Sequence, residues 1–230
     1  MLALENIEIV QGDFWLSADF QLKPNQTTAI LGPSGGGKST LLMALAGFIE
    51  HNGDTRWQGE SLKNLTPAQR PVSMLFQEHN LFPHLSVKQN VGLGLRPDLK
   101  LSADGQAKVE AALERVGLAG KGARLPRALS GGQRQRAALA RALLRQKPIW
   151  LLDEPFAALG PGLRIEMLAL VEEMRAEQEA TLLLVTHAPD DAKRIAAEVV
   201  FVDAGHASAP APTEVFFAQP SKGLRAYLGN

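Results

Sequence analysis

One glycine-rich stretch limits how this chain of 230 residues can fold more than any other feature. It reads Gly32-Pro33-Ser34-Gly35-Gly36-Gly37-Lys38-Ser39-Thr40 and fits the pattern G-x-x-x-x-G-K-[ST]. An apolar strand is expected just before it, over Thr27 to Leu31, and an apolar helix just after it, over Leu41 to Phe48. In that setting the glycines let successive backbone N–H groups surround phosphate oxygens at a helix N-terminus. The stretch therefore predicts an α/β fold built around a phosphate-binding loop.

Two pairs of polar side chains fit the chemistry of nucleotide hydrolysis. Within the loop, Lys38 is expected to reach the β- and γ-phosphates, and Ser39 to offer its hydroxyl to Mg²⁺. Asp153 and Glu154 follow an apolar strand expected over Ile149 to Leu152. Ligands of open α/β sheets bind at the carboxyl ends of strands. Asp153 is therefore predicted to bind magnesium, and Glu154 to orient and deprotonate the attacking water.

The rest of the chain alternates between strand-like and helix-like segments. Further strands are expected over Leu2 to Val10, Phe14 to Leu22, Thr55 to Gln58, Val72 to Phe76, Thr181 to Val185 and Glu198 to Asp203. Helices are expected after Ser86, after Ser102, over Gln133 to Leu144, over Leu163 to Glu177 and in short turns after Thr213. This alternation favours a largely parallel sheet. Gly205 to Pro212, rich in Ala and Pro, is expected to be a loop.

Composition excludes several classes of function. Lys plus Arg and Asp plus Glu number 24 each, so no net field attracts DNA or RNA, and no nucleic-acid partner is expected. The absence of cysteine excludes a disulfide framework, a thiol nucleophile and thiolate metal sites. The longest apolar run, Leu41 to Ile49, is far shorter than the roughly 20 residues of a membrane-spanning helix. Any membrane role is therefore expected to be peripheral.

A second glycine turn precedes an Arg-rich helix and reads Leu129-Ser130-Gly131-Gly132-Gln133. It predicts a second anion site, although one chain seldom needs two for one phosphate. With both motifs, nearly the whole chain resembles the ATP-binding cassette (ABC) family. Members of that family pair head to tail, so that the signature turn of each subunit closes on the nucleotide held by the phosphate loop of its partner. The resemblance implies a homodimer that uses ATP and Mg²⁺.

The resemblance also assigns roles to single residues. Gln77, after the strand expected over Val72 to Phe76, corresponds to the glutamine that senses metal and water, and His187 to the histidine that senses the γ-phosphate. The implied catalytic residues are Glu154, His187 and Gln77, and the implied metal ligands are Ser39, Gln77 and Asp153. The implied nucleotide contacts are Gly32, Pro33, Ser34, Gly35, Gly36, Gly37, Lys38, Ser39, Thr40, Ser130, Gly131, Gly132 and Gln133.

The fold implied by the resemblance is a single ABC ATPase domain over residues 1–230. Its P-loop NTPase core, with an N-terminal antiparallel β subdomain, is expected over residues 1–80 and 147–230. An inserted α-helical subdomain that carries the signature turn is expected over about residues 81–146.

The sequence departs from the family pattern at two places. The family stacks adenine on an aromatic residue near the end of the first strand, whereas the nearest aromatic residues here are Phe14 and Trp15. Either could stack on the base, or both could pack within the sheet. The loop after Glu154 usually reads Ser-Ala-Leu-Asp, whereas here it reads Ala157-Ala158-Leu159-Gly160. Coupling between the two sites of a dimer would therefore lack its usual hydroxyl and carboxylate.

Within the family, the chain looks most like the ATPase of bacterial importers, and its stretches Arg70 to Glu78 and Asn90 to Leu95 look most like the thiamine branch. Such a subunit would lie at the cytoplasmic face of the bacterial inner membrane and act on separate transmembrane permease subunits. It would serve a periplasmic substrate-binding protein indirectly. The stretch Glu78 to Val87, with Phe82 and Leu85, would help to form the groove for a short permease helix.

Two other functions stay open. A soluble ABC ATPase acting on ribosomes or DNA usually has two cassettes or a long coiled coil, and neither is visible here. The altered loop from Ala157 to Gly160 instead suggests a nucleotide-gated interaction subunit that hydrolyses poorly. A GTPase is expected to carry an Asn-Lys-x-Asp motif that reads the base, and this motif does not occur in the sequence.

Overall fold

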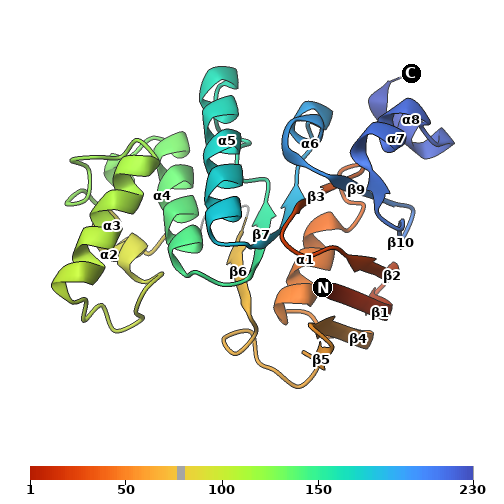
Figure 1. Ribbon diagram of the computed structural model, residues 1–230, viewed down its shortest axis with the longest axis horizontal. Helices are drawn as coiled ribbons and strands as arrows, with labels where there is room; N and C mark the ends of the chain where they lie inside the picture. Colours follow the sequence, from red (N-terminus) through yellow and green to blue (C-terminus); the bar gives the residue numbers. More distant parts are fainter. Residues whose placement is uncertain (77–80, 230) are drawn as a thin grey trace.

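Parallel strands form the centre of the computed structural model, which describes residues 1–76 and 81–229. Side by side lie, in spatial order, β9 (Glu198–Asp203), β3 (Thr27–Leu31), β8 (Thr181–Val185), β7 (Ile149–Asp153) and β6 (Val72–Leu75) (Figure 1). Each neighbouring pair in this group is parallel. Every residue of β3, β7 and β8 is buried, as is typical of a parallel sheet with both faces covered.

Antiparallel strands extend the sheet. They are β1 (Leu2–Gln11), β2 (Phe14–Leu22), β4 (Asn52–Trp57) and β5 (Glu60–Ser61), with β1 between β2 and β4. The two-residue strand β10 (His206–Ala207) runs parallel to β2 and antiparallel to β9, and so joins both groups into one sheet. The short β11 (Ala211–Pro212) pairs with β9. The fold is thus the predicted α/β architecture with an N-terminal antiparallel part.

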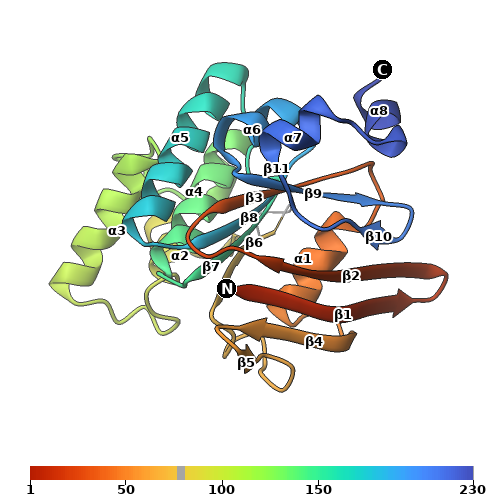
Figure 2. The same cartoon turned by 45° about the vertical axis from the view of Figure 1, so that its right-hand side comes forward.

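Helices cover both faces of the parallel strands. On one face, α1 (Lys38–Ala46) packs between the antiparallel and the parallel strands (Figure 2) and shares a core with β2, β7 and β8. On the other face lie α5 (Pro161–Glu177) and α6 (Pro189–Ile195), followed by the C-terminal helices α7 (Thr213–Ala218) and α8 (Lys222–Leu228). The phosphate loop is therefore held between a buried strand and a buried helix.

A second group of helices lies at one end of the molecule, beyond β6 (Figure 1). It consists of α2 (Val87–Gly92), α3 (Ala103–Arg115) and α4 (Gly131–Leu144), with the 3-10 turn η1 (Pro126–Ala128) before α4. These helices share an apolar core of their own. Ser86, Ser102 and Ser130 accept hydrogen bonds from the first turns of α2, α3 and α4, as N-cap residues do. The helical stretch predicted beyond residue 81 is confirmed, and its exact limits as a subdomain stay a prediction.

Three local predictions were wrong. Gly205 to Pro212 contains β10 and β11, because strands of two residues are too short to leave an alternating pattern. The helix after the phosphate loop begins at Lys38 and not at Leu41, because it starts directly from the left-handed Gly37. Helix α6 was missed because it is short, although Pro189 begins it and two aspartates lie in its first turn.

In the part of the chain that the structure describes, every helix is too short or too polar to span a membrane.

Arg70 fixes the end of α1. Its buried guanidinium donates hydrogen bonds to the carbonyl oxygens of Ala44 (3.1 Å) and Leu45 (2.8 Å), and its Nε donates to Leu65 O (3.3 Å). The last carbonyls of a helix have no partner within the helix, so a buried cation satisfies them. Gly47, with φ 85°, leaves room for this side chain, since a Cβ there would lie 2.6 Å from Nε.

Replacing Arg70 by Met is expected to lower the free energy of unfolding by about 2–3 kcal/mol, because Leu45 O and Leu65 O lose the guanidinium as a donor and Ala44 O keeps only Gly47 N. The midpoint of thermal unfolding should fall by roughly 4–12 °C. The control is Arg56→Met, which removes surface ion pairs with Glu5 and Asp54 and a hydrogen bond to Gly59 O, and should cost about 0–1 kcal/mol. Equal effects of the two substitutions would contradict the role of Arg70.

Candidate functional site

Three loops meet at the carboxyl ends of β3, β7 and β8. In the sheet, Val185 of β8 pairs with Ile30 of β3 on one side and with Asp153 of β7 on the other. Backbone hydrogen bonds continue beyond the strands, from Glu154 N to Val185 O (3.1 Å) and from Thr186 N to Ile30 O (3.4 Å). The phosphate loop, the two carboxylates and His187 therefore lie at the same edge of the sheet.

The phosphate loop depends on glycine at two positions with positive φ. At Gly32, a Cβ would lie 2.0 Å from the carbonyl oxygen of Val202, so a side chain is excluded by backbone. At Gly37, the N-cap of α1, φ is 100° and a Cβ would lie 2.7 Å from Cζ of Phe14. The loop thus turns into the helix in a conformation that only glycine adopts easily.

The ammonium group of Lys38 is held by its own loop. Nζ donates to Gly32 O (2.9 Å) and Pro33 O (2.7 Å), and the residue is 5% exposed. Burial lowers the pKa of Lys38, and the nearby charges of Glu154 and Asp153 oppose that shift. An ammonium has three donors, so one N–H remains for a phosphate oxygen.

The side chain of Asp153 fits a magnesium ligand. The residue is 4% exposed, and the Ser39 side chain hydrogen-bonds to its carboxylate. Its Oδ1 has no hydrogen-bond partner among the described residues. Burial raises the pKa of Asp153, while Ser39 and Lys38 act in the opposite direction. A buried carboxylate with an unused oxygen next to a hydroxyl is the hard oxygen donor set that Mg²⁺ prefers.

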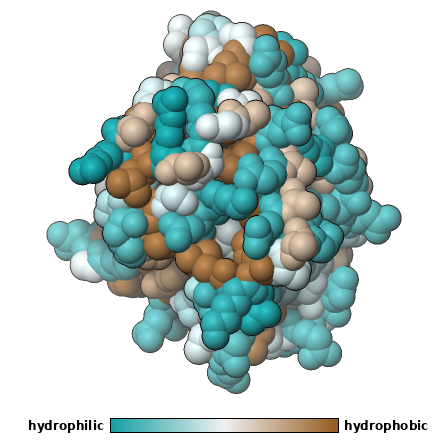
Figure 3. Space-filling view, turned by 90° about the vertical axis from the view of Figure 1, so that its left-hand side faces the viewer, coloured by the Kyte–Doolittle hydropathy of each residue, from teal (hydrophilic) through white to brown (hydrophobic). Residues whose placement is uncertain are grey.

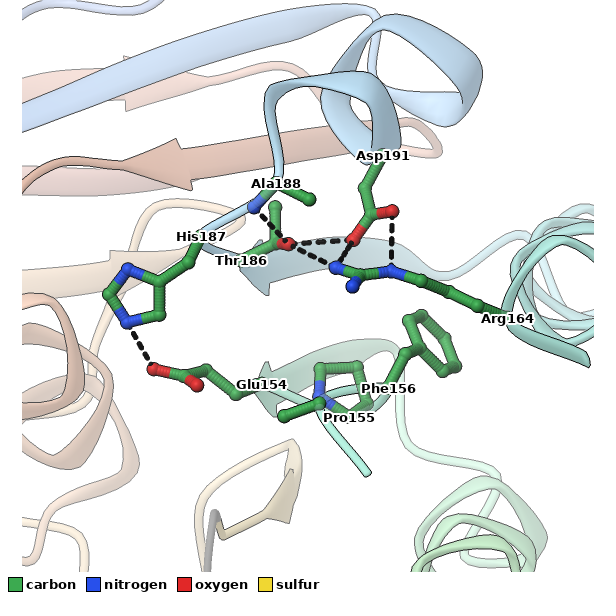
Figure 4. A pocket seen from close by; sticks show the side chains of 9 residues that line it. Glu154, Pro155, Phe156, Arg164, Thr186, His187, Ala188 and Asp191 are labelled. Carbon is green, nitrogen blue, oxygen red and sulfur yellow. Dashed lines mark hydrogen bonds and ion pairs between the residues drawn. The ribbon is translucent and has the colours of Figure 1, made fainter. Parts of the chain in front are cut away.

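Glu154 and His187 face each other across the mouth of the site. Nε2 of His187 lies 2.6 Å from Oε1 of Glu154 (Figure 4). Glu154 has a φ of 49°, which is uncommon for a residue with a long side chain. On the other side of His187, the hydroxyl of Tyr227 in α8 donates to the carbonyl oxygen of His187 (3.0 Å).

A pocket of about 360 Å³ lies over the phosphate loop. It brings part of the phosphate loop together with two of the predicted catalytic residues, and its lining comprises Phe14, Ser34, Gly35, Gly37, Lys38, Ser39, Thr40, Glu154 and His187. Residues from β2, from the phosphate loop and from the loops after β7 and β8 thus converge on one cavity.

A buried ion pair supports the loop of His187 from behind (Figure 4). Arg164, in the first turn of α5, makes a two-pronged contact with Asp191 of α6. The hydroxyl of Thr186 donates to Asp191 Oδ2 (2.6 Å) and accepts from Ala188 N (3.1 Å). The residues before and after His187 are therefore tied to both helices.

The signature turn lies elsewhere in the molecule. Ser130 and Gln133 form a capping box at the start of α4, in which Gln133 N donates to Ser130 Oγ (3.3 Å). A Cβ at Gly132 would lie 3.0 Å from Cδ2 of Leu159, in the loop that follows Glu154. Among the described residues, the turn thus contacts this loop and does not belong to the lining of the phosphate pocket.

The structure separates the two aromatic candidates. Phe14 lines the pocket and contacts the position of Gly37. Trp15 is 47% exposed and packs against Gly205, where a Cβ would lie 2.9 Å from its ring. Gln77 lies outside the described residues.

Sequence reasoning missed several residues around the site. Gln135 was counted only as part of an Arg-rich helix, and no local pattern reveals that it is buried against the loop after Glu154. For Asp191 the sequence offers one weak indication of a helix start, since acidic residues shortly after a proline such as Pro189 are typical of a first helical turn. Arg164 and Tyr227 act through contacts between distant segments, which a single sequence does not show.

Comparison with known proteins places these residues in context. Residues 16–157 match the family model described as "ABC transporter". The chain is similar to "Thiamine import ATP-binding protein ThiQ" of Cereibacter sphaeroides, with 57% identity over 230 residues that cover 100% of both chains. The protein with the same name from Ruegeria sp. is 52% identical over 100% of both chains. The one from Vibrio parahaemolyticus is 49% identical over 99% of this chain and 98% of its own length.

A solved structure is similar as well. It is described as the dimeric structure of a post-hydrolysis state of the ATP-binding cassette MJ0796 bound to ADP and Pi. The TM-score is 0.83, with 26% identity over 93% of this chain and 99% of that chain.

Replacing Glu154 by Gln is expected to lower ATP turnover by about 10²–10⁴-fold, because the amide keeps the shape but does not accept a proton from water at neutral pH. Binding of ATP with Mg²⁺, measured by a fluorescent analogue, should stay near wild type. The matched variant Asp153→Asn, one residue earlier, should instead lose the dependence of ATP binding on Mg²⁺. Turnover of the Glu154 variant near the wild-type rate would contradict its assignment as the base.

Proposed function

The chain belongs to the ABC transporter family, and from that membership we propose that it is the ATP-hydrolysing subunit of an importer for thiamine or its phosphates. The observation that carries the proposal is identity of 57% over the full length of a thiamine import ATP-binding protein. The geometry supports it, since residues of the phosphate loop, Glu154 and His187 line one pocket. A soluble ABC ATPase acting on ribosomes or DNA is the weaker alternative, because similarity to the import proteins extends over the whole chain.

In this proposal the side chains around the phosphate loop have separate roles in phosphoryl transfer. The backbone of the phosphate loop and Lys38 hold the phosphates, while Ser39 and Asp153 would hold Mg²⁺. When bound, Mg²⁺ supplies positive charge that offsets the charge of the phosphate oxygens. Glu154 orients the attacking water and accepts its proton. His187, 2.6 Å from Glu154, senses the γ-phosphate, and Gln77 is proposed to sense metal and water.

We propose that two copies pair head to tail around ATP. The signature turn, residues 130–133, begins α4, and its capping box uses the N–H groups of Ser130 and Gln133. The N–H groups of Gly131 and Gly132, in the first turn of the helix, are proposed to bind a nucleotide held by another copy. The MJ0796 cassettes, which are similar in fold, are described as dimeric. On this arrangement, residues 81–146 act as the subdomain that brings the turn to the partner.

The permease is proposed to dock next to α2, at the cytoplasmic face of the membrane. Phe82 is 47% exposed, and the buried Asn90 holds its backbone by accepting from Phe82 N (2.7 Å) and donating to Phe82 O (3.0 Å). Asn90 also donates to Leu85 O (3.0 Å), so Phe82 and Leu85 are presented by a fixed turn. The end of the molecule that carries α2 and α3 is hydrophilic with hydrophobic surface between the polar side chains (Figure 3), as expected of an interface for a separate subunit. A periplasmic substrate-binding protein would act on the permease and not on this chain.

Thiamine import predicts a specific stimulation of ATPase activity. When the chain is reconstituted in vesicles with its permease and a thiamine-binding protein, thiamine should raise turnover, whereas choline, a smaller organic cation, should not. The double variant Phe82→Ser and Leu85→Ser should keep the ATPase activity of the free subunit and lose the stimulation. If the subunit alone hydrolyses ATP but thiamine does not stimulate the reconstituted complex, the proposal that thiamine is the cargo is contradicted. If the subunit has no ATPase activity, the result favours a subunit that hydrolyses poorly.

The position of Phe14 supports it as the aromatic contact for adenine. Replacing Phe14 by Ala is expected to weaken ATP binding about 10-fold, since stacking of a base on an aromatic ring contributes roughly 1–3 kcal/mol. Trp15→Ala should change the Kd by less than about 2-fold, because its ring packs on Gly205. Isothermal titration with ATP and Mg²⁺ measures both. A larger loss in the Trp15 variant would reverse the assignment.

A further inference from the structure

Gln135 uses both ends of its side-chain amide on the main chain of the loop that carries Glu154. The residue lies in α4, close after the signature turn, and is 1% exposed. Its Nε2 donates to the carbonyl oxygen of Glu154 (3.1 Å), and its Oε1 accepts from the backbone N–H of Ala158 (3.2 Å). One buried side chain thus spans the start and the end of this turn.

The turn needs such support because Glu154 has a φ of 49°. A side chain in this left-handed region costs about 1–3 kcal/mol and persists only where the surroundings fix it. Glu154 N donates to Val185 O (3.1 Å), and its carbonyl accepts from Gln135 and from Ala157 N (3.3 Å). These bonds fix the main chain from which the carboxylate of Glu154 reaches His187.

The same helix carries the signature turn at its N-terminus. Gly132 packs against Ala158 and Leu159, which follow Glu154 in the chain. The loop from Ala157 to Gly160 has neither a side-chain hydroxyl nor a carboxylate. The hydrogen bonds of Gln135 are therefore a direct connection between the signature helix and the main chain of Glu154 in the same subunit.

We infer that Gln135 is a positioning residue for hydrolysis: it sets the main chain of Glu154 from the signature helix, so that binding at the signature turn is linked to the position of the base in the same subunit. The inference rests on the proposed ATPase function. It concerns a contact within one chain, in addition to the contact of the turn with the partner's nucleotide.

Gln135→Met tests the inference, since Met has a similar length and makes neither hydrogen bond. We expect kcat to fall roughly 10- to 100-fold, because a displacement of about 1 Å at the reacting groups has an effect of this size. The Kd for ATP should change less than about 2-fold, since the phosphate loop is untouched. The control is Ser73→Ala, which removes the buried hydrogen bond of Ser73 to Ala142 O near the other end of α4. Its kcat should stay within about 2-fold of wild type at a similar loss of thermal stability.

A double variant separates positioning from general stability. In the Glu154→Gln background, adding Gln135→Met should cause no further loss of turnover, because residues that act as one unit are not additive. A multiplied loss, or wild-type kcat in the single variant, would overturn the inference. Gln135→Glu keeps the size and the acceptor for Ala158 N but sets a carboxylate oxygen against Glu154 O in place of the donor, so it should also lower kcat if the Met variant does not fold. If neither variant folds, Gln135 has a purely structural role and the inference is overturned as well. An inactive wild-type chain would instead contradict the proposed ATPase function.

Discussion

The alignment of three parallel strands is the constraint on which the site depends. Because β3, β8 and β7 pack into separate cores on their two faces, a shift of one residue in their register would move every side chain into the wrong core, and the pairing is fixed. Ile30, Val185 and Asp153 therefore end in one row. Loops that leave this row bring the lysine, the carboxylates and the histidine within reach of one ligand, although they are far apart in the chain.

The site gathers charges that are costly to bury. Burial lowers the pKa of Lys38 and raises the pKa of Asp153, so the surroundings disfavour both charged forms, while the attraction between the two groups offsets part of this. A ligand that contributes both phosphate oxygens and a cation complements the two groups at once. Binding of this ligand then offsets the unfavourable free energy of burying Lys38 and Asp153, and the ligand stabilises the folded state.

The sequence was informative where the chemistry is local. The phosphate loop, the strand before it and the carboxylates after β7 follow from short patterns, since glycine spacing and apolar runs act within a few residues. The strands β10 and β11 form by pairing with strands far away in the sequence, and two residues are too few to show an alternating pattern that would predict them. Gln135 was equally hidden, because an amide in an Arg-rich helix has a meaning only once the loop of Glu154 lies against it. The left-handed φ of Glu154 also follows from tertiary contacts and not from its residue type.

Helix α8 places the end of the described chain close to the chemistry. The Tyr227 hydroxyl donates to the carbonyl oxygen of His187, and its ring packs edge-on against Phe201 of β9. An affinity tag or fluorescent fusion added after this helix would therefore disturb the main chain of the histidine. One placed before β1 would instead extend from the half-exposed Met1, next to an antiparallel strand. The position of a label thus affects the ATPase rate that is measured, and labels for single-molecule or immobilised assays should be attached at the N-terminus.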